Sequence, residues 1–170
     1  MTVTADFGSL EFVPFTEPDV EVFTHIMKRA FDYDTQIHTE QAEGGPPGYD
    51  DGGFLRKYYL HEDSMSYKVS KDGRPAGAVC VWINANNVNY LGNIFVALEF
   101  QDKGLGKTIW DFIEHRYPDT IKWQTDTPAF SRRNHHFYVN KLGFRIVRIE
   151  NPKSANDCSY FMEKDMECHR

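Results

Sequence analysis

The sequence predicts a mixed α/β (α+β) fold, in which one sheet of about six or seven strands carries helices on both faces. Helical stripes of apolar residues alternate with shorter runs that suit strands. The strand-like runs cover residues 10–15, 66–70, 76–83, 88–96, 121–125, 144–149 and 159–162. A chain of 170 residues is most simply one domain with a substantial core, so we expect a single domain over 1–170.

The N-terminal strand and helix have clear boundary signals. Pro14 restricts the first strand to a sheet edge or a strand end, because proline has no N–H to donate. The following helix has an N-cap near Thr16 and Pro18 in its first turn. The apolar stripe expected to face the core consists of Val22, Phe23, Ile26, Met27 and Ala30.

Helical periodicity disappears from Asp32 to Gly53, where glycine and proline are densest at 44–53. A loop of this length inside a compact domain is usually either functional or disordered. A short helix is expected over Phe54–Leu60. The loop carries several rings and carboxylates, including Asp34, Tyr49 and Asp50.

The central and C-terminal elements are bounded by turn residues. Asp72-Gly73 predicts a tight hairpin turn, and residues 84–87 form the next turn of an antiparallel meander. A helix over 103–116 ends before Pro118, and a helix over 132–141 ends at Gly143. The first of these helices should bury Leu105, Ile109, Phe112 and Ile113.

Composition excludes several classes of protein. The net charge of −6 argues against a protein that binds nucleic acid through its phosphates. Cys80, Cys158 and Cys168 show no paired spacing that would indicate a disulfide framework. The N-terminus does not resemble a secretory signal, and no apolar run approaches the ~20 residues of a membrane span. We therefore expect a cytoplasmic protein that binds neither nucleic acid nor membrane.

Residues 93–108 form the most informative segment, because a strand, a glycine-bearing turn and a helix start follow one another. The unpaired N–H groups and dipole of such a helix start bind phosphate. A P-loop would need glycine where the chain has Gln101, and a dinucleotide fingerprint would need glycine at Ile109. What remains is a Q-x-x-G-x-G-K motif after a strand.

This motif resembles the acyl-CoA-binding motif of the GNAT superfamily of N-acyltransferases. A second segment, Asn134 to Phe144, is similar to the C-terminal landmark of that family, an asparagine followed by a tyrosine and a final Gly-Phe. The order of the expected elements also matches the family fold. The resemblance implies an N-acetyltransferase that moves an acetyl group from acetyl-CoA to a primary amine of a small molecule or peptide.

The resemblance also assigns residues to the donor. Backbone groups of the strand would pair with the pantetheine arm, the turn would donate amides to the pyrophosphate, and either Lys103 or Lys107 would add charge. Asn134 would make a hydrogen bond to the cofactor, unless Ser131 takes its place. The implied cofactor-binding residues are Ile94, Phe95, Val96, Gln101, Asp102, Lys103, Gly104, Leu105, Gly106, Lys107 and Asn134.

Catalytic roles are assigned less directly. Tyr138 is the candidate acid for the leaving thiolate, with a packed core tyrosine as the alternative. The family usually places this tyrosine four residues before the glycine, where this chain has Val139, so an inserted residue or a shortened helix would have to restore the geometry. Asp34 and Glu99 are the candidate catalytic carboxylates. Tyr49, Asp50 and Asp126 are further groups that a proton path could use.

No set of Cys and His residues has the spacing of a zinc site, and the adjacent His135 and His136 diverge by about 100° on a helix. We therefore expect no metal. A non-catalytic CoA-binding or sensory module on the same fold is the alternative function. Members of the family often pair, so a homodimer is compatible with the resemblance.

Overall fold

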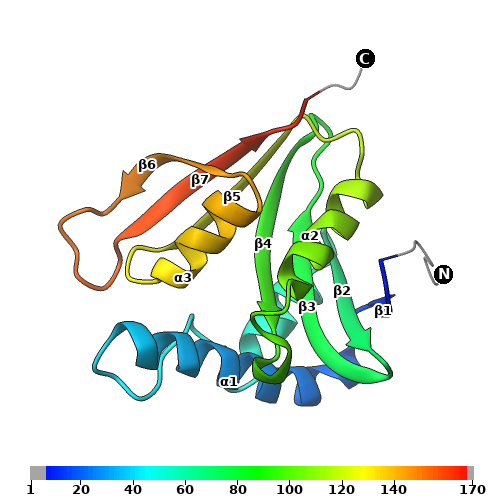
Figure 1. Cartoon of the computed structure of the whole chain (residues 1–170), viewed down its shortest axis with the longest axis horizontal. Coiled ribbons are helices and arrows are strands. Elements are labelled where there is room, and N and C mark those ends of the chain that lie inside the picture. The colour runs from blue at the N-terminus through cyan, green and yellow to red at the C-terminus, as the bar shows by residue number, and fades with distance from the viewer. Residues whose placement is uncertain (1–6, 168–170) are drawn as a thin grey trace.

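The computed structural model describes residues 7–167, in which one sheet of seven strands has the order β1-β2-β3-β4-β5-β7-β6 (Figure 1). Neighbouring strands are antiparallel except β4 and β5, which run parallel. The predicted mixed, mostly antiparallel fold is confirmed. Cys168 and residues 1–6 of the N-terminus lie outside the described residues.

The strands are β1 (Leu10–Pro14), β2 (Ser64–Lys71), β3 (Arg74–Trp82), β4 (Val88–Val96), β5 (Lys122–Pro128), β6 (Arg145–Glu150) and β7 (Ser159–Asp165). The α-helices are α1 (Val20–His38), α2 (Leu105–Arg116) and α3 (Arg132–His135). Short 3₁₀ turns, η1 (Glu17–Asp19) and η3 (Leu98–Phe100), precede α1 and follow β4. Two π-helices, η2 (Leu55–Tyr59) and η4 (His136–Lys141), complete the described elements.

Helices cover both faces of the sheet, as the alternation along β3 requires. Val79 and Val81 pack in a cluster with Ile109 and Phe112 of α2 and with the fully buried Trp123. Ala78 and Cys80 point to the other face, in a cluster with side chains of α1 and η2. Each residue of a central strand therefore contributes to one of two cores.

The N-terminal signals are confirmed. Pro14 ends β1, which is an edge strand of the sheet. Thr16 and Asp19 form a capping box, in which the Thr16 N–H donates to Asp19 Oδ2 at 2.9 Å. One stripe residue was predicted wrongly: Val22 is 50% exposed, whereas Phe23, Met27 and Ala30 are buried.

Helix α1 continues to His38, so the prediction of a loop from Asp32 was wrong for its first seven residues. The apolar helical periodicity is interrupted there because the helix buries two polar side chains, Asp32 and Thr35. Both side chains hold the following loop. The Thr35 hydroxyl donates to Gly44 O at 2.8 Å, and the Gly44 N–H donates to Asp32 Oδ1 at 3.1 Å.

Tyr49 belongs to this loop anchor. Its hydroxyl donates to Asp32 Oδ1 at 2.6 Å, and Lys28 Nζ lies 2.6 Å from Asp32 Oδ2. Burial and the neighbouring Asp32 raise the pKa of Tyr49 to about 12. Burial alone would raise the pKa of Asp32, but the Lys28, Tyr49 and Gly44 hydrogen bonds outweigh it and lower that pKa. Tyr49 therefore holds the loop, and Asp50 is exposed.

We expect Asp32→Asn to lower the free energy of unfolding by about 1–3 kcal/mol at pH 7, because three donors lose an ionised partner. The pKa of Asp32 is lower in the folded protein than in the unfolded chain. Its stabilising contribution is therefore complete above the ordinary carboxyl pKa of ~3.9 and is lost as the pH falls through the folded-state pKa. Urea unfolding at pH 7 and pH 3 should show the gap between wild type and variant narrowing in acid. Asp63→Asn, at a carboxylate 75% exposed, is the control and should leave stability unchanged. A gap that persists undiminished in acid would contradict this account.

Candidate acyl-CoA and acceptor site

Strands β4 and β5 separate after a short shared stretch. They pair from Val88 to Tyr90 on β4 and from Lys122 to Gln124 on β5. Beyond that point β4 pairs with β3 as far as Val96, whereas β5 pairs with β7. Residues 91–96 therefore present one backbone edge toward the gap. The Thr125 hydroxyl covers the start of this edge by donating to Leu91 O at 2.8 Å.

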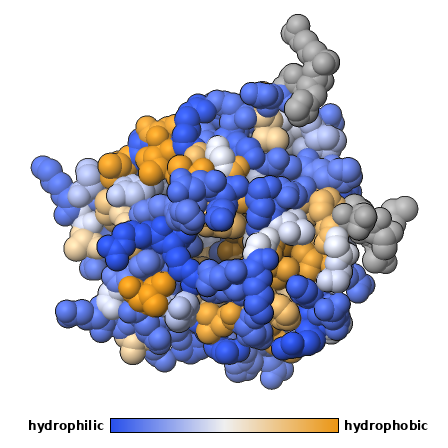
Figure 2. All heavy atoms as spheres, viewed as in Figure 1, coloured by the Kyte–Doolittle hydropathy of each residue, from blue (hydrophilic) through white to orange (hydrophobic). Residues whose placement is uncertain are grey.

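A cavity of about 590 Å³ occupies the gap and is lined by α1, β4, the β4–α2 turn and the α3–η4 segment. Figure 2 shows the corresponding face hollowed near its centre, with apolar atoms in the depth and hydrophilic residues at the rim. Ten of the eleven predicted cofactor residues line this cavity; Lys103 is the exception. Its ammonium instead donates to Glu99 O at 3.1 Å.

The turn before α2 has the backbone that an anion site needs. Asp102 and Gly104 both have positive φ, 59° and 79°, and Gly104 is the N-cap of α2. The first N–H groups of α2 therefore point toward the cavity with the positive end of the helix dipole. Gln101 closes the turn by donating from Nε2 to Val96 O at 2.9 Å, and its buried Oε1 has no partner among the described residues.

Gly106 has a packing role that spacing alone did not indicate. A Cβ at this position would lie 2.8 Å from Phe137 Cε2, so glycine lets η4 pack against the start of α2. At Gly104 no atom lies within 4 Å of an added Cβ, so its positive φ is the reason for glycine there. Glycine is therefore required at 104 by the backbone conformation and at 106 by close packing.

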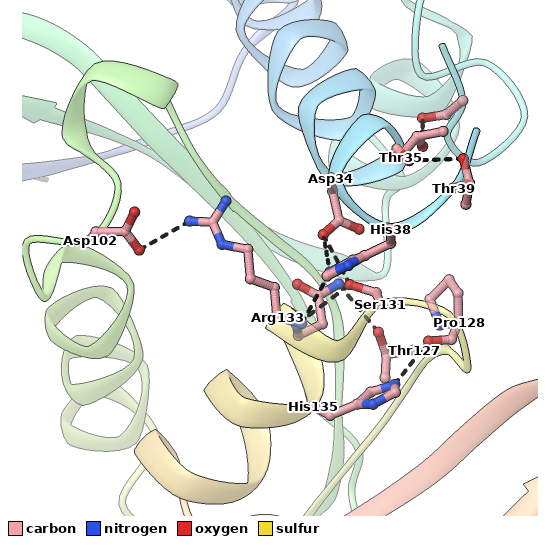
Figure 3. Close-up of polar contacts among 12 residues, drawn as sticks. Asp34, Thr35, His38, Thr39, Asp102, Thr127, Pro128, Ser131, Arg133 and His135 are labelled. Carbon is pink, nitrogen blue, oxygen red and sulfur yellow. Dashed lines mark hydrogen bonds and ion pairs between the residues drawn. The ribbon is translucent and has the colours of Figure 1, made fainter. Parts of the chain in front are cut away.

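Arg133 is a cavity residue that the sequence reading missed. Its guanidinium pairs with Asp102 Oδ1 at 3.1 Å (Figure 3). It also lies 5.4 Å from the ring centre of Tyr33. The available signal was its place directly before Asn134, which also lines the cavity. Lys107, on the opposite wall, is paired with Asp111.

Asp34 connects α1 to α3 across the base of the cavity (Figure 3). Its Oδ1 accepts a hydrogen bond from the fully buried Ser131 hydroxyl at 3.1 Å and lies 3.5 Å from His38 Nε2. His38 Nε2 also accepts the Arg133 N–H at 3.2 Å. Ser131, the alternative to Asn134 as a cofactor-binding residue, is the N-cap of α3 and does not line the cavity.

Tyr138 lies in the π-helix η4, whose extra residue is marked by the Leu142 N–H donating to Phe137 O at 3.0 Å. The prediction left open whether an inserted residue compensates for the unusual tyrosine–glycine spacing, and a π-helix is such an insertion. Tyr138 is 7% exposed, and its hydroxyl is not one of the buried polar atoms that lack a partner. Burial first, and then the charges of Asp126 and Asp34, raise the pKa of Tyr138.

The remaining candidate carboxylates lie in different surroundings. Glu99 is 40% exposed, pairs with Arg29 at 3.5 Å and does not line the cavity. Asp126 is exposed on β5 and accepts the hydroxyl of Tyr90 from β4. Of the candidate catalytic residues only Asp34 lines the cavity, whereas Tyr138, Asp126 and Glu99 do not.

Within residues 7–167, no three His, Cys, Asp or Glu side chains gather as metal ligands. His135 Nε2 contacts Pro128 O at 3.0 Å, and His136 Nδ1 contacts Asn140 Nδ2 at 2.8 Å, in separate directions. No helix in the described part of the chain is long and apolar enough to cross a membrane.

Comparison with solved structures shows the same fold in known acetyltransferases. The PaiA N-acetyltransferase from Thermoplasma acidophilum, solved in complex with coenzyme A, matches with a TM-score of 0.75 at 16% identity, over 94% of this chain and 100% of that one. An acetyltransferase from Thermus thermophilus matches with a TM-score of 0.74 at 14% identity, over 94% of this chain and 99% of that one.

Sequence comparison identifies the family. The uncharacterized protein YrkN from Bacillus subtilis (strain 168) is 34% identical over 141 residues, which are 82% of this chain and 75% of YrkN. The model of the Acetyltransferase (GNAT) family matches residues 25–144, which include the β4–α2 turn and the segment through Phe144. The chain therefore belongs to the GNAT family of acetyltransferases, whose members use acetyl-CoA.

Proposed function

We propose that this chain, as a single domain over 1–170, transfers an acetyl group from acetyl-CoA to a primary amine of a small molecule or peptide. The observation that carries the proposal is the cavity between the free edge of β4 and the N-terminus of α2. An extended pantetheine arm and a pyrophosphate need these two features side by side.

In the proposed complex the pantetheine arm extends along Ile94–Val96 and adds hydrogen bonds to the free edge of β4. The pyrophosphate accepts from the first N–H groups of α2 at Gly104 to Lys107. Lys107 and Arg133 stand on opposite walls and supply positive charge, once the phosphates replace their present partners Asp111 and Asp102. Asn134 Nδ2, now donating to Thr127 Oγ1 at 3.3 Å, is a further donor at the wall.

The chemistry follows from the thioester. A neutral amine attacks the acetyl carbonyl, its C–N bond forms, and the C–S bond breaks with both electrons leaving on sulfur. The developing oxyanion needs an N–H donor, for which the backbone near Val96 is placed. The proposed donor to the thiolate is Tyr138, whose raised pKa keeps its proton available, and the proposed acceptor of the ammonium proton, directly or through water, is Asp34.

Donor binding is tested by calorimetry with acetyl-CoA. Gly104→Glu puts a carboxylate and a strained backbone where the pyrophosphate would lie, and we expect the Kd to rise at least about a hundredfold. Gly104→Gln, with the same strain and size but no charge, is the matched control, and its Kd for acetyl-CoA should lie between those of wild type and Gly104→Glu. Wild type that binds no tighter than Gly104→Glu would exclude this placement of the donor.

Catalysis is tested by thiol release with a panel of primary amines. We expect Tyr138→Phe to lower kcat by about 10²–10⁴-fold and leave the Kd of acetyl-CoA unchanged, because only the departing thiolate needs the proton. Tyr117→Phe removes a hydroxyl that bonds to Tyr67 in the core and should leave kcat unaltered. Because the pKa of Tyr138 is raised, wild-type kcat should not decline up to about pH 10.

Two results would contradict the catalytic proposal. Unchanged kcat in Tyr138→Phe would show that another group protonates the thiolate. Tight acetyl-CoA binding with no thiol release on any amine would identify a non-catalytic CoA-binding module instead.

A further inference from the structure

The end of the gap opposite the cavity is built from aromatic rings and one carboxylate. Tyr90 is the last β4 residue that pairs with β5, and its hydroxyl donates to Asp126 Oδ1 two residues beyond its β5 partner. Trp82 of β3 lies opposite Tyr90 of β4. The Trp82 ring covers Gly92, where an added Cβ would lie 2.4 Å from Trp82 Cζ3. An exposed carboxylate thus stands at the point where the strands part.

The polar groups around this point have fixed directions. The Tyr59 hydroxyl donates to Asn93 Oδ1 at 2.6 Å, so the Asn93 amide turns its Nδ2 donors away from Tyr59. The Tyr138 hydroxyl, on a buried side chain, is acted on by Asp126 and Asp34. The Tyr138 hydroxyl is not among the buried polar atoms that lack a partner, so it reaches solvent and is open to a ligand.

The charges at this end are negative. The carboxylate here is Asp126, which accepts the Tyr90 hydroxyl and whose charge contributes to the raised pKa of both Tyr90 and Tyr138. The following cations of β5 and β6 already form ion pairs with carboxylates of β6 and β7. These pairs are Lys122–Glu163 at 3.1 Å, Arg145–Asp165 at 2.5 Å and Arg148–Glu150 at 2.5 Å.

The rings at this end, Tyr58, Trp82 and Tyr90, suit an ammonium group. The Lys57 ammonium lies 5.1 Å from the ring centre of Tyr58, which in turn contacts Trp82 at 6.2 Å between ring centres. Rings at this distance attract cations through their electron-rich faces. Lys57 is also the nearby cation that a substrate carboxylate would use, so the test below includes it.

We propose that the acceptor is a primary amine with no carboxylate on the carbon that bears it, and that Asp126 is the residue that determines this specificity. The proposal rests on the proposed acetyl transfer and names its substrate class: alkylamines, arylalkylamines, lysine side chains or peptide N-termini, but not free α-amino acids. Asp126 attracts the ammonium as it enters and repels a carboxylate that enters beside it.

The expected size of this selection follows from Coulomb's law. The carboxylate of an α-amino acid stays within a few ångströms of its amine, so it would enter close to Asp126. Like charges about 5 Å apart in a partly exposed site repel strongly enough to change relative rates by at least about tenfold. Removing the charge of Asp126 should remove most of that preference.

The experiment compares amines that differ only by the carboxylate, tyramine with tyrosine and agmatine with arginine. We expect kcat/KM for tyramine and agmatine to exceed that of the paired amino acid at least about tenfold. Asp126→Asn keeps an acceptor for the Tyr90 hydroxyl and should reduce each ratio to within about threefold of unity. Asp119→Asn, at an exposed carboxylate in the turn before β5, should keep the wild-type ratios.

Binding gives a second reading that does not depend on turnover. Tyramine should bind to the CoA-saturated protein and tyrosine should not, with the difference lost in Asp126→Asn. Equal ratios for both members of each pair, ratios that persist in Asp126→Asn, or a preference for tyrosine that Lys57→Gln abolishes would overturn the proposal. Absence of thiol release with every amine would overturn the acetyl-transfer function, whereas selective tyramine binding would still support the specificity of the site.

Discussion

The free edge of β4 is the constraint on which the rest of the structure depends. Backbone N–H and C=O groups that leave a sheet must find other partners or remain in contact with water. The protein covers the two ends of this edge with its own side chains, Thr125 at Leu91 O and Gln101 at Val96 O. The backbone between them is left free, and in the proposed complex the extended donor pairs with it.

Keeping the gap open requires contacts that hold its walls at a fixed separation. At one end Tyr90 and Asp126 join β4 to β5 directly. At the base Asp34 and Ser131 join α1 to α3, and His38 holds the Arg133 backbone. Because these contacts connect segments far apart in sequence, the width of the gap is a property of the whole fold and not of the glycine motif.

Sequence patterns predicted the parts that depend on local rules. The strands and α2 followed from alternation and helical spacing, and the positive φ of Gly104 and Gly143 agreed with their turn positions. The end of α1 could not be predicted, because Asp32 and Thr35 are polar residues whose burial depends on the loop that folds back on them. For Tyr138 the tyrosine–glycine spacing indicated an irregularity, but only the fold shows that it is the extra residue of a π-helix.

The two ends of the gap differ in polarity, and that difference fits the proposed binding of an anionic donor and a cationic acceptor. The cavity end has the α2 N-terminus, Lys107 and Arg133, which suit phosphates; the other end has Asp126 beside Tyr90 and Trp82, which suit an ammonium. An anionic donor and a cationic acceptor that enter from opposite ends would each be repelled at the wrong one. Tyr138 is the proposed acid, and burial together with the charges of Asp126 and Asp34 raises its pKa, so that it stays protonated. In the proposed reaction, the carboxylates that would sort the two substrates also help to keep Tyr138 protonated.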